Sequence, residues 1–355
     1  MKQIDDLQEQ LVNFITTQVC IVDNNTFVLV ANWYPKDKPE TYEGAEKYPS
    51  KVISININTK TVGWTLYDTG LLKSYTDGGY IDGKKIALSS DLNANFCVFN
   101  YENGDNGSEP SETHFAVRNI RLIGQHFYAA SSRRNIYRRN SKNSWEMISA
   151  TPHQLDNPNN IATHAIDGFS ENDMYMCGDL GDLWHYNGSI WKQLDPPCNW
   201  HMAFLICANN GMVYVGGEQG QLLAGKNGNW EEVITQELAF NKGYTAYDMT
   251  FFKDTLYIAT GFSVYSLKEN SWVSVDGISS RSTLECIDAN SDIMIIGGKD
   301  KITIFDGKKE EILYSDNSDL NNAKIVASSI ASIADDIRDT GDELLDTIQL
   351  MKPKK

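Results

Sequence analysis

Residues 172–194 read NDMYMCGDLGDLWHYNGSIWKQL, and residues 210–233 read NGMVYVGGEQGQLLAGKNGNWEEV. Both stretches contain, in the same order, a polar turn, a tyrosine, a glycine-containing turn, a short apolar run, an Asn-Gly turn and a tryptophan. Residues 253–275 and 124–148 repeat the tyrosine, the apolar run and the tryptophan, and residues 291–313 form a weaker copy. The chain therefore contains an internal repeat, and the repeat decides the fold.

The spacing of the repeat is that of a four-stranded β-propeller blade. Within the Tyr175 copy, we expect strands over 163–169, 173–177, 183–186 and 190–194, because β-branched and aromatic residues alternate there with turn residues. Asn and Gly tolerate positive φ, so Asn187-Gly188 is expected to form the last hairpin turn. Corresponding positions in successive copies lie 38–47 residues apart: Tyr128, Tyr175, Tyr214, Tyr257 and Ile295.

Five blades are well marked, and residues 18–112 contribute two weaker ones. The prediction is therefore an all-β propeller with seven blades, six being the alternative. The well-marked blades cover residues 113–150, 160–196, 199–235, 243–276 and 282–315.

Two helices are expected to flank the ring, which divides the chain into a short N-terminal helix (1–16), the propeller (17–316) and a C-terminal amphipathic helix (322–351). Apolar residues recur at helical spacing in both segments, including Leu7 and Leu11 in the first. The C-terminal helix has two interpretations: it covers the flank of the propeller, or it forms a seam for self-association or for a partner helix.

The first stretch also contains a cysteine, aspartates and a histidine within ten positions, which raises the possibility of a metal or acid–base site. Cys177, Asp179 and His185 do not recur as a set in the next copy, so we interpret them as structural. Gly220–Lys226 fits the spacing of a phosphate-binding loop, but Asn227 stands where Ser or Thr is needed. We predict no catalytic residue, no metal site and no cofactor.

The copies resemble the blades of a bacterial β-propeller repeat family with Asp-box-like and tryptophan–aspartate-repeat-like blades. The resemblance is carried by Asn172–Gly178 and Leu183–Trp191; it extends over residues 113–315 and is weaker over 18–112. It implies the propeller fold and a tendency to bind other molecules. It does not imply one function, because propellers serve many.

Composition narrows the class of protein. The 355 residues carry a formal charge of −16, which argues against a general nucleic-acid binder. No apolar run is long enough to span a membrane, and the acidic start MKQIDDLQEQL is unlike a secretory signal. The six cysteines have no paired spacing and are expected to be free thiols in a reducing compartment, so we expect a cytoplasmic location.

Three groups of residues are candidates for binding. His114, His164 and His201 are each expected to open the innermost strand of successive blades, near one mouth of the central channel. The second group is the arginines of RRNIYRR (133–139). The third group is the acids of the insert at 34–50, which is a candidate contact surface because loops on a rigid scaffold carry specificity. The second and third groups are Arg133, Arg134, Arg138, Arg139, Glu40, Glu43 and Glu46.

Two functions follow as hypotheses. The first is a non-catalytic propeller that binds another protein, such as a bacterial immunity protein that neutralises a basic toxin domain, since an acidic surface steers a basic partner. The second is a small-ligand-binding or carbohydrate-binding propeller, with or without hydrolytic activity, that uses the channel mouth. The sequence does not determine the oligomeric state.

Overall fold

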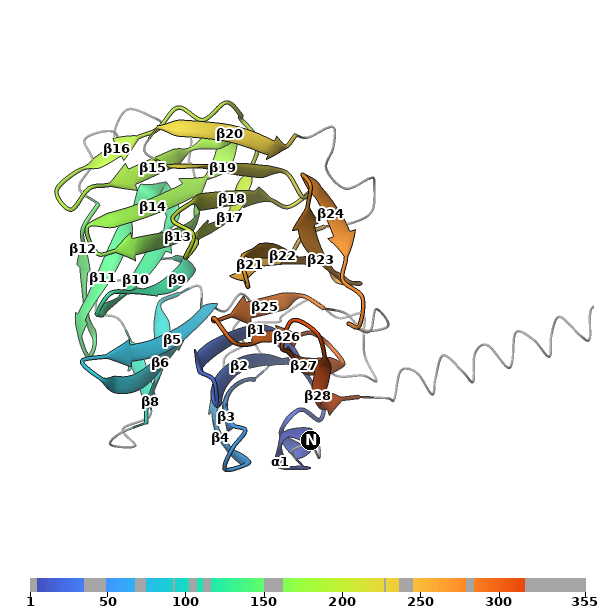
Figure 1. Ribbon diagram of the computed structural model, residues 1–355. Coiled ribbons are helices and arrows are strands. Elements are labelled where there is room, and N and C mark those ends of the chain that lie inside the picture. The colour runs from blue at the N-terminus through green and yellow to red at the C-terminus, as the bar shows by residue number, and fades with distance from the viewer. Residues whose placement is uncertain are drawn as a thin grey trace, which may run out of the picture. The chain divides into compact units, whose positions relative to one another are not determined.

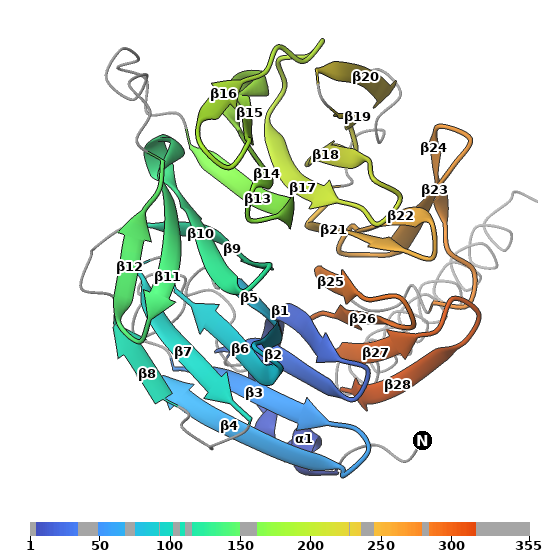
Figure 2. The same ribbon diagram turned by 60° about the vertical axis from the view of Figure 1, so that its left-hand side comes forward.

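The structure is a computed structural model that describes residues 5–34, 49–67, 75–91, 93–101, 107–110, 116–149, 162–226, 228–235, 245–278 and 284–316. Within these residues, 28 strands form seven four-stranded antiparallel sheets. The sheets stand around a central axis as the blades of a propeller (Figure 1 and Figure 2). The predicted fold is confirmed, with seven blades rather than six.

Each blade is built from four consecutive strands, and the first strand of each lies nearest the axis (Figure 2). Blades 1 to 3 consist of β1 (Phe14–Asp23), β2 (Thr26–Trp33), β3 (Ser50–Asn56) and β4 (Thr61–Tyr67); β5 (Tyr75–Ile81), β6 (Lys84–Ser90), β7 (Asn95–Asn100) and β8 (Gly107–Pro110); and β9 (Val117–Ile123), β10 (His126–Ser131), β11 (Ile136–Ser141) and β12 (Ser144–Met147). Blades 4 and 5 consist of β13 (Thr163–Ser170), β14 (Asp173–Gly178), β15 (Leu183–Tyr186) and β16 (Trp191–Gln193); and β17 (Met202–Cys207), β18 (Val213–Gly217), β19 (Leu222–Lys226) and β20 (Asn229–Ile234). Blades 6 and 7 consist of β21 (Asp248–Phe252), β22 (Thr255–Ala259), β23 (Val264–Lys268) and β24 (Ser271–Ser274); and β25 (Cys286–Ala289), β26 (Met294–Gly297), β27 (Lys301–Phe305) and β28 (Glu310–Ser315).

The strands expected in blade 4 agree with those observed to within two residues. Gly188 forms the expected hairpin turn at φ +89°, where a Cβ atom would come within 2.9 Å of the Asn172 side chain. Blade 2 was only half expected, because its second strand β6 lacks the tyrosine of the repeat and its fourth strand β8 lacks the tryptophan.

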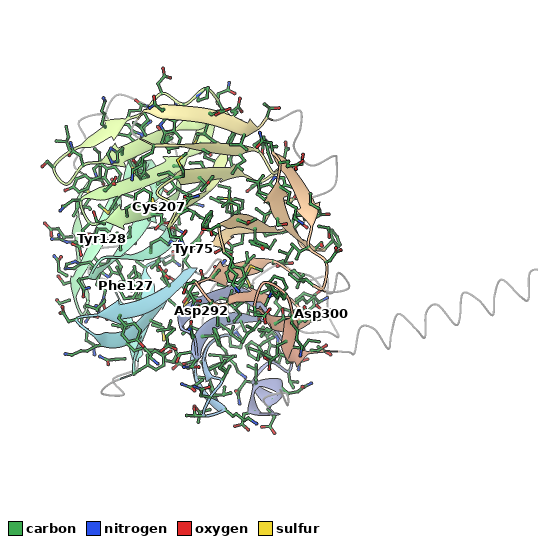
Figure 3. All side chains as sticks on the ribbon, viewed as in Figure 1. Tyr75, Phe127, Tyr128, Cys207, Asp292 and Asp300 are labelled. Carbon is green, nitrogen blue, oxygen red and sulfur yellow. The ribbon has the colours of Figure 1, made fainter. Side chains whose placement is uncertain are left out.

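Apolar side chains fill the interfaces between blades. In the described residues there are seven hydrophobic clusters, and each joins two neighbouring blades. Because side chains alternate along a strand, Phe127 of β10 packs toward blade 2 while the adjacent Tyr128 packs toward blade 4 (Figure 3). Both are almost completely buried, and burying a side chain of this size contributes about 1.5–3 kcal/mol.

The tryptophans of the repeat occupy equivalent outermost strands and pack against the preceding blade. Trp145 of β12 stacks on Phe96 of blade 2, with ring centroids 4.5 Å apart. Trp272 of β24 donates a 2.7 Å hydrogen bond to the carbonyl oxygen of Gly220 in blade 5. Trp191 lies in the cluster between blades 3 and 4, and Trp230 in the cluster between blades 4 and 5. Trp230 is only half-buried.

The N-terminal segment supports the junction of blades 1 and 7. Helix α1 (Asp5–Gln10) ends earlier than expected, because Phe14 begins β1, where its ring meets Trp33 edge-on with the ring centroids 5.2 Å apart. Leu7 and Leu11 are buried in one cluster with residues of both blades. Residues up to Tyr314 form one compact unit, and Ser315 begins a second. The predicted C-terminal helix lies outside the described residues.

The described residues contain no helix with the length and apolar character needed to cross a bilayer.

Candidate functional site

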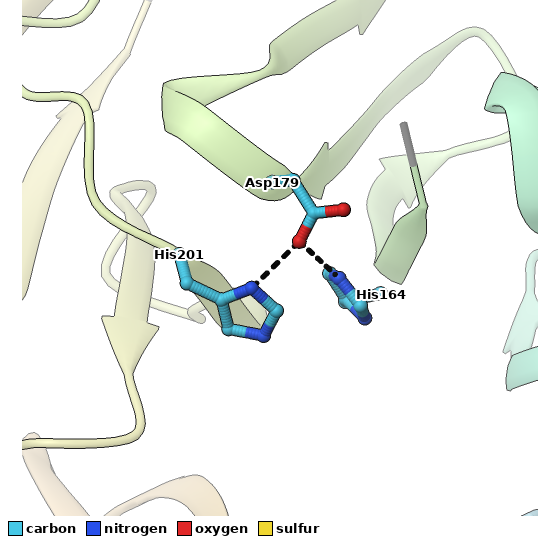
Figure 4. Close-up of side chains that lie close together, drawn as sticks. All are labelled: His164, Asp179 and His201. Carbon is cyan, nitrogen blue, oxygen red and sulfur yellow. Dashed lines mark hydrogen bonds and ion pairs between the residues drawn. The ribbon is translucent and has the colours of Figure 1, made fainter. Parts of the chain in front are cut away.

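Two histidines and an aspartate meet where blades 4 and 5 begin at the axis (Figure 4). Asp179 Oδ1 accepts hydrogen bonds from His164 Nε2 at 2.9 Å and from His201 Nδ1 at 2.7 Å. The two imidazole centroids are 4.2 Å apart. The exposed fractions of the side chains are 20% for His164, 30% for Asp179 and 43% for His201, so the site is open to solvent. We call these residues the His–Asp–His cluster.

Backbone geometry holds the cluster in place. Asp179 begins the 3-10 turn η4 (Asp179–Gly181) between β14 and β15, and its Oδ2 accepts a 3.0 Å hydrogen bond from the Ala162 N–H. Gly181 has φ +75°, and its N–H donates to the carbonyl oxygen of Trp200, which ties the turn to blade 5. A Cβ atom there would lie 2.4 Å from the Cys198 carbonyl oxygen, so the close approach requires glycine.

His164 is aimed at Asp179 by a β-bulge. The register of β13 against β14 shifts between Thr163 and Ala165, so His164 is the extra residue. Bulges re-aim a side chain and are common beside functional sites. His201 reaches the same carboxylate from blade 5, just before β17.

The electrostatics favour neutral imidazole at His164 and an ionised carboxylate at Asp179. Burial lowers the pKa of His164 against the opposing effect of Asp179, and His201 and Arg118 lower it further. Burial works to raise the pKa of Asp179, but hydrogen bonds from His164 and from the Ala162 N–H outweigh it, and the net shift is downward.

The structure brings two of the three predicted histidines together and adds a residue that we had interpreted as structural. His114 lies outside the described residues. His164 and His201 were expected at equivalent positions, but the strand registers place His201 two positions earlier in its blade. The sequence already contains this difference of two positions, because His164 precedes the tyrosine of its repeat by 11 residues and His201 precedes its own by 13. Nothing in the sequence links Asp179 to these two histidines, because only the fold brings its carboxylate between them.

The predicted arginines mostly make intramolecular ion pairs. Arg133 and Arg134 lie in the turn η2 (Ser132–Arg134), as expected. Arg134 donates two hydrogen bonds, of 2.8 and 2.9 Å, to Asp182 of blade 4. Arg139 pairs equally closely with Glu109 of blade 2, and Arg138 with Glu146 of its own blade. These pairs link three blades, and the role of the four arginines in partner binding stays a prediction.

The third group of candidates, Glu40, Glu43 and Glu46, lies outside the described residues.

Carboxylates near the axis form a second feature that the sequence analysis missed. Each of four aspartates on an innermost strand accepts a hydrogen bond from a backbone N–H of the next blade's innermost strand: Asp77 from Leu122, Asp167 from Cys207, Asp248 from Ile287 and Asp288 from Ile21. Arg121 lies 3.4 Å from Asp167 and is the nearby counter-charge. These aspartates connect blades, and burial raises the pKa of Asp248 to about 6 and, with Asp77, that of Asp288 to about 7.

Comparison with known proteins identifies one distant relative in sequence. No family model matches the chain. The immune protein Tsi7 of Pseudomonas aeruginosa is 31% identical over 153 residues, which are 42% of this chain and 48% of that protein. The chain thus matches about half the length of this relative.

Solved structures agree on the fold. The WD40 β-propeller domain of Doa1 superposes with a TM-score of 0.56 at 11% identity, covering 84% of this chain and 94% of that one. YCF48 from Cyanidioschyzon merolae also has a TM-score of 0.56, at 12% identity, covering 82% of this chain and 95% of that one. At these identities the likeness shows the propeller fold alone.

Proposed function

We propose that this protein is an immunity protein that binds and neutralises a toxin protein. The observation that carries the proposal is the 31% identity to the immune protein Tsi7. Because the match covers about half of that relative, the identity of the toxin does not transfer with it. The proposal includes a cytoplasmic location and a binding rather than a catalytic role.

The properties of the chain suit such a role. A formal charge of −16 attracts a basic domain and speeds its encounter with the propeller. Seven interblade clusters make a rigid frame that presents its loops without a large change of shape. Affinity on such a scaffold is therefore expected to come from its loops and its surface charge.

The experiment is a protection assay in which each protein encoded by a gene next to this protein's gene is tested as the toxin. Co-expression with that toxin should restore the growth of a bacterial host, and the two purified proteins should form a stable complex on size-exclusion chromatography. The Trp145→Ala variant is expected to be less stable, so it tests whether protection requires the folded propeller. Absence of both protection and complex formation would contradict the proposal for that toxin.

The salt dependence of binding tests the electrostatic part of the proposal. Affinity should fall as salt rises, because the Debye length is about 8 Å at physiological ionic strength. Replacing Glu40, Glu43 and Glu46 with glutamine should slow association more than it speeds dissociation. The matched control neutralises three exposed acids elsewhere on the propeller, Glu231, Asp254 and Glu269. Equal effects of both variants would assign the steering to net charge and not to the insert.

The His–Asp–His cluster favours a second candidate function, the binding of a small ligand or carbohydrate near the axis. A variant with His114, His164 and His201 all changed to alanine separates the two functions. If toxin binding by the wild type does not depend on salt and this variant no longer binds the toxin, the partner site lies at the cluster. Unchanged toxin binding would keep it elsewhere.

A further inference from the structure

We propose that His164, Asp179 and His201 bind one divalent transition-metal ion, with Zn²⁺ as the representative, and leave part of its coordination sphere open. No metal site is predicted from the sequence alone, because no further ligand is evident there beside the three histidines. The structure supplies that ligand as Asp179. The inference is independent of the proposed immunity function.

The donor set is one that zinc uses. The nitrogen atoms and the carboxylate oxygen of the cluster all lie within 4.8 Å of one another. Two imidazoles and one carboxylate are the protein ligands of an open zinc site, whose remaining position is taken by water or by another molecule. Within the described part of the chain, no other group of three histidine, cysteine or acidic side chains has this spacing.

The surroundings of the cluster match those of metal ligands. Asp179 Oδ1 faces both histidines while its Oδ2 is held by the Ala162 N–H, so one oxygen is available to a metal and the other fixes the carboxylate. His201 Nδ1 faces the cluster, and its Nε2 lies 3.9 Å from Glu218 Oε1. Metal-binding histidines usually direct the second ring nitrogen at a carboxylate, a carbonyl or water.

The chemistry of binding is simple. In the metal-free arrangement the two imidazole N–H groups point at Asp179 Oδ1. A metal ion takes the place of those two protons, and each neutral imidazole then carries its proton on the other ring nitrogen. The exposed fractions of His201 and Asp179, 43% and 30%, leave the open side of the ion toward solvent.

Two other histidine–carboxylate contacts show what sets the cluster apart. His126 Nδ1 lies 2.8 Å from Glu171, and His185 Nε2 lies 2.8 Å from Asp173. Each is a single imidazole on a single carboxylate, so neither offers three ligands. His126 has an exposed fraction of 35% and serves as the matched control position.

The experiment is isothermal titration of the full chain, freed of metal by chelator, with Zn²⁺. We expect one site per chain and a rise in melting temperature with Zn²⁺. Asp179→Asn and the double variant His164→Ala/His201→Ala should each weaken binding at least about tenfold, whereas His126→Ala should bind as the wild type does. No saturable site in the wild type, or equal binding by all variants, would overturn the proposal.

Titration of the wild type with Co²⁺ keeps the test independent of variant folding. Binding at the cluster should produce visible d–d absorption of the intensity typical of four- or five-coordinate Co²⁺, and Zn²⁺ should abolish it. A weak spectrum like that of aqueous Co²⁺ at saturating protein would overturn the proposal.

Discussion

The ion pair between Arg134 and Asp182 joins blades 3 and 4 and provides a sharp test of the packing. The exposed fractions are 9% for the arginine side chain and 5% for the aspartate. Asp182 also accepts hydrogen bonds from Trp184 Nε1 at 2.9 Å and from Gln193 Nε2 at 3.4 Å. The Arg134 guanidinium carbon lies 5.1 Å from the centre of the Trp184 ring. Removing Arg134 therefore leaves a carboxylate buried with only neutral partners.

The expected cost of Arg134→Met follows from these contacts. Breaking a buried pair from one side destabilises by about 3–5 kcal/mol, because the remaining charge is uncompensated. Trp184 and Gln193 still donate to Asp182, so we expect a value of about 3 kcal/mol. Arg134 has φ +61°, and methionine has the same steric cost at that angle, so backbone strain cancels from the difference.

The double variant Arg134→Met/Asp182→Asn removes the stranded charge and should recover about 2 kcal/mol relative to the single variant. The free energies of unfolding are measured by urea denaturation at pH 7, followed by both tryptophan fluorescence and circular dichroism. Arg138→Met is the control, because its pair with Glu146 is exposed and is expected to contribute less than about 1 kcal/mol. A cost below about 1 kcal/mol for Arg134→Met, or additive effects in the double variant, would refute the reasoning.

Other expectations use the same assay or a simple one. Trp145→Ala should lower the free energy of unfolding by about 3–5 kcal/mol, because the ring of Trp145 is buried against Phe96. Trp230→Ala should lower it by less, because Trp230 is only half-buried, and equal losses would contradict the packing of these two tryptophans. Burial raises the pKa of Asp288 from 3.8 to about 7, so the folded state gains stability as the pH falls from about 7 toward 4. Asp288→Asn should flatten that part of the stability–pH curve by roughly 1–4 kcal/mol, and an unchanged curve would exclude Asp288 as its source. A thiol reagent should label the native protein slowly, because burial raises the pKa of every cysteine for which a shift is resolved, the half-buried Cys198 included; rapid labelling of Cys198 would contradict this.

The repeat was enough to predict the blades because each copy carries its own strand and turn signals. Tyr175, Asn187-Gly188 and Trp191 mark a strand, a hairpin and the next strand within a short stretch, and these are local properties. Blade 2 was harder, because its strand β5, YTDGGYI, contains two glycines and little apolar alternation. The strand conformation of β5 therefore depends on contacts with the blades on either side and not on local propensity.

The candidate site could be predicted only in part. His164 and His201 are predictable because each precedes the repeat tyrosine of its blade by a similar interval, which places both near the start of an innermost strand. Asp179 was set aside because no equivalent aspartate recurs in the other copies, although a site formed by two blades needs no repetition. The contact depends on a bulge at His164 and a left-handed turn at Gly181, and both are properties of tertiary structure.

The junction of blades 1 and 7 has a consequence for the chain's connectivity. In the described strands, no strand is exchanged between these blades, and the ring closes through side chains: the cluster around Leu7 and Leu11, and the hydrogen bond from the Ile21 N–H to Asp288. Every blade is thus an uninterrupted segment of sequence. A linker from the end of β28 to the start of α1, with a cut between β12 and β13, would leave all seven sheets whole, so a circularly permuted propeller can form the same ring. For the same reason, a gene duplication that adds one repeat adds one complete blade and splits none.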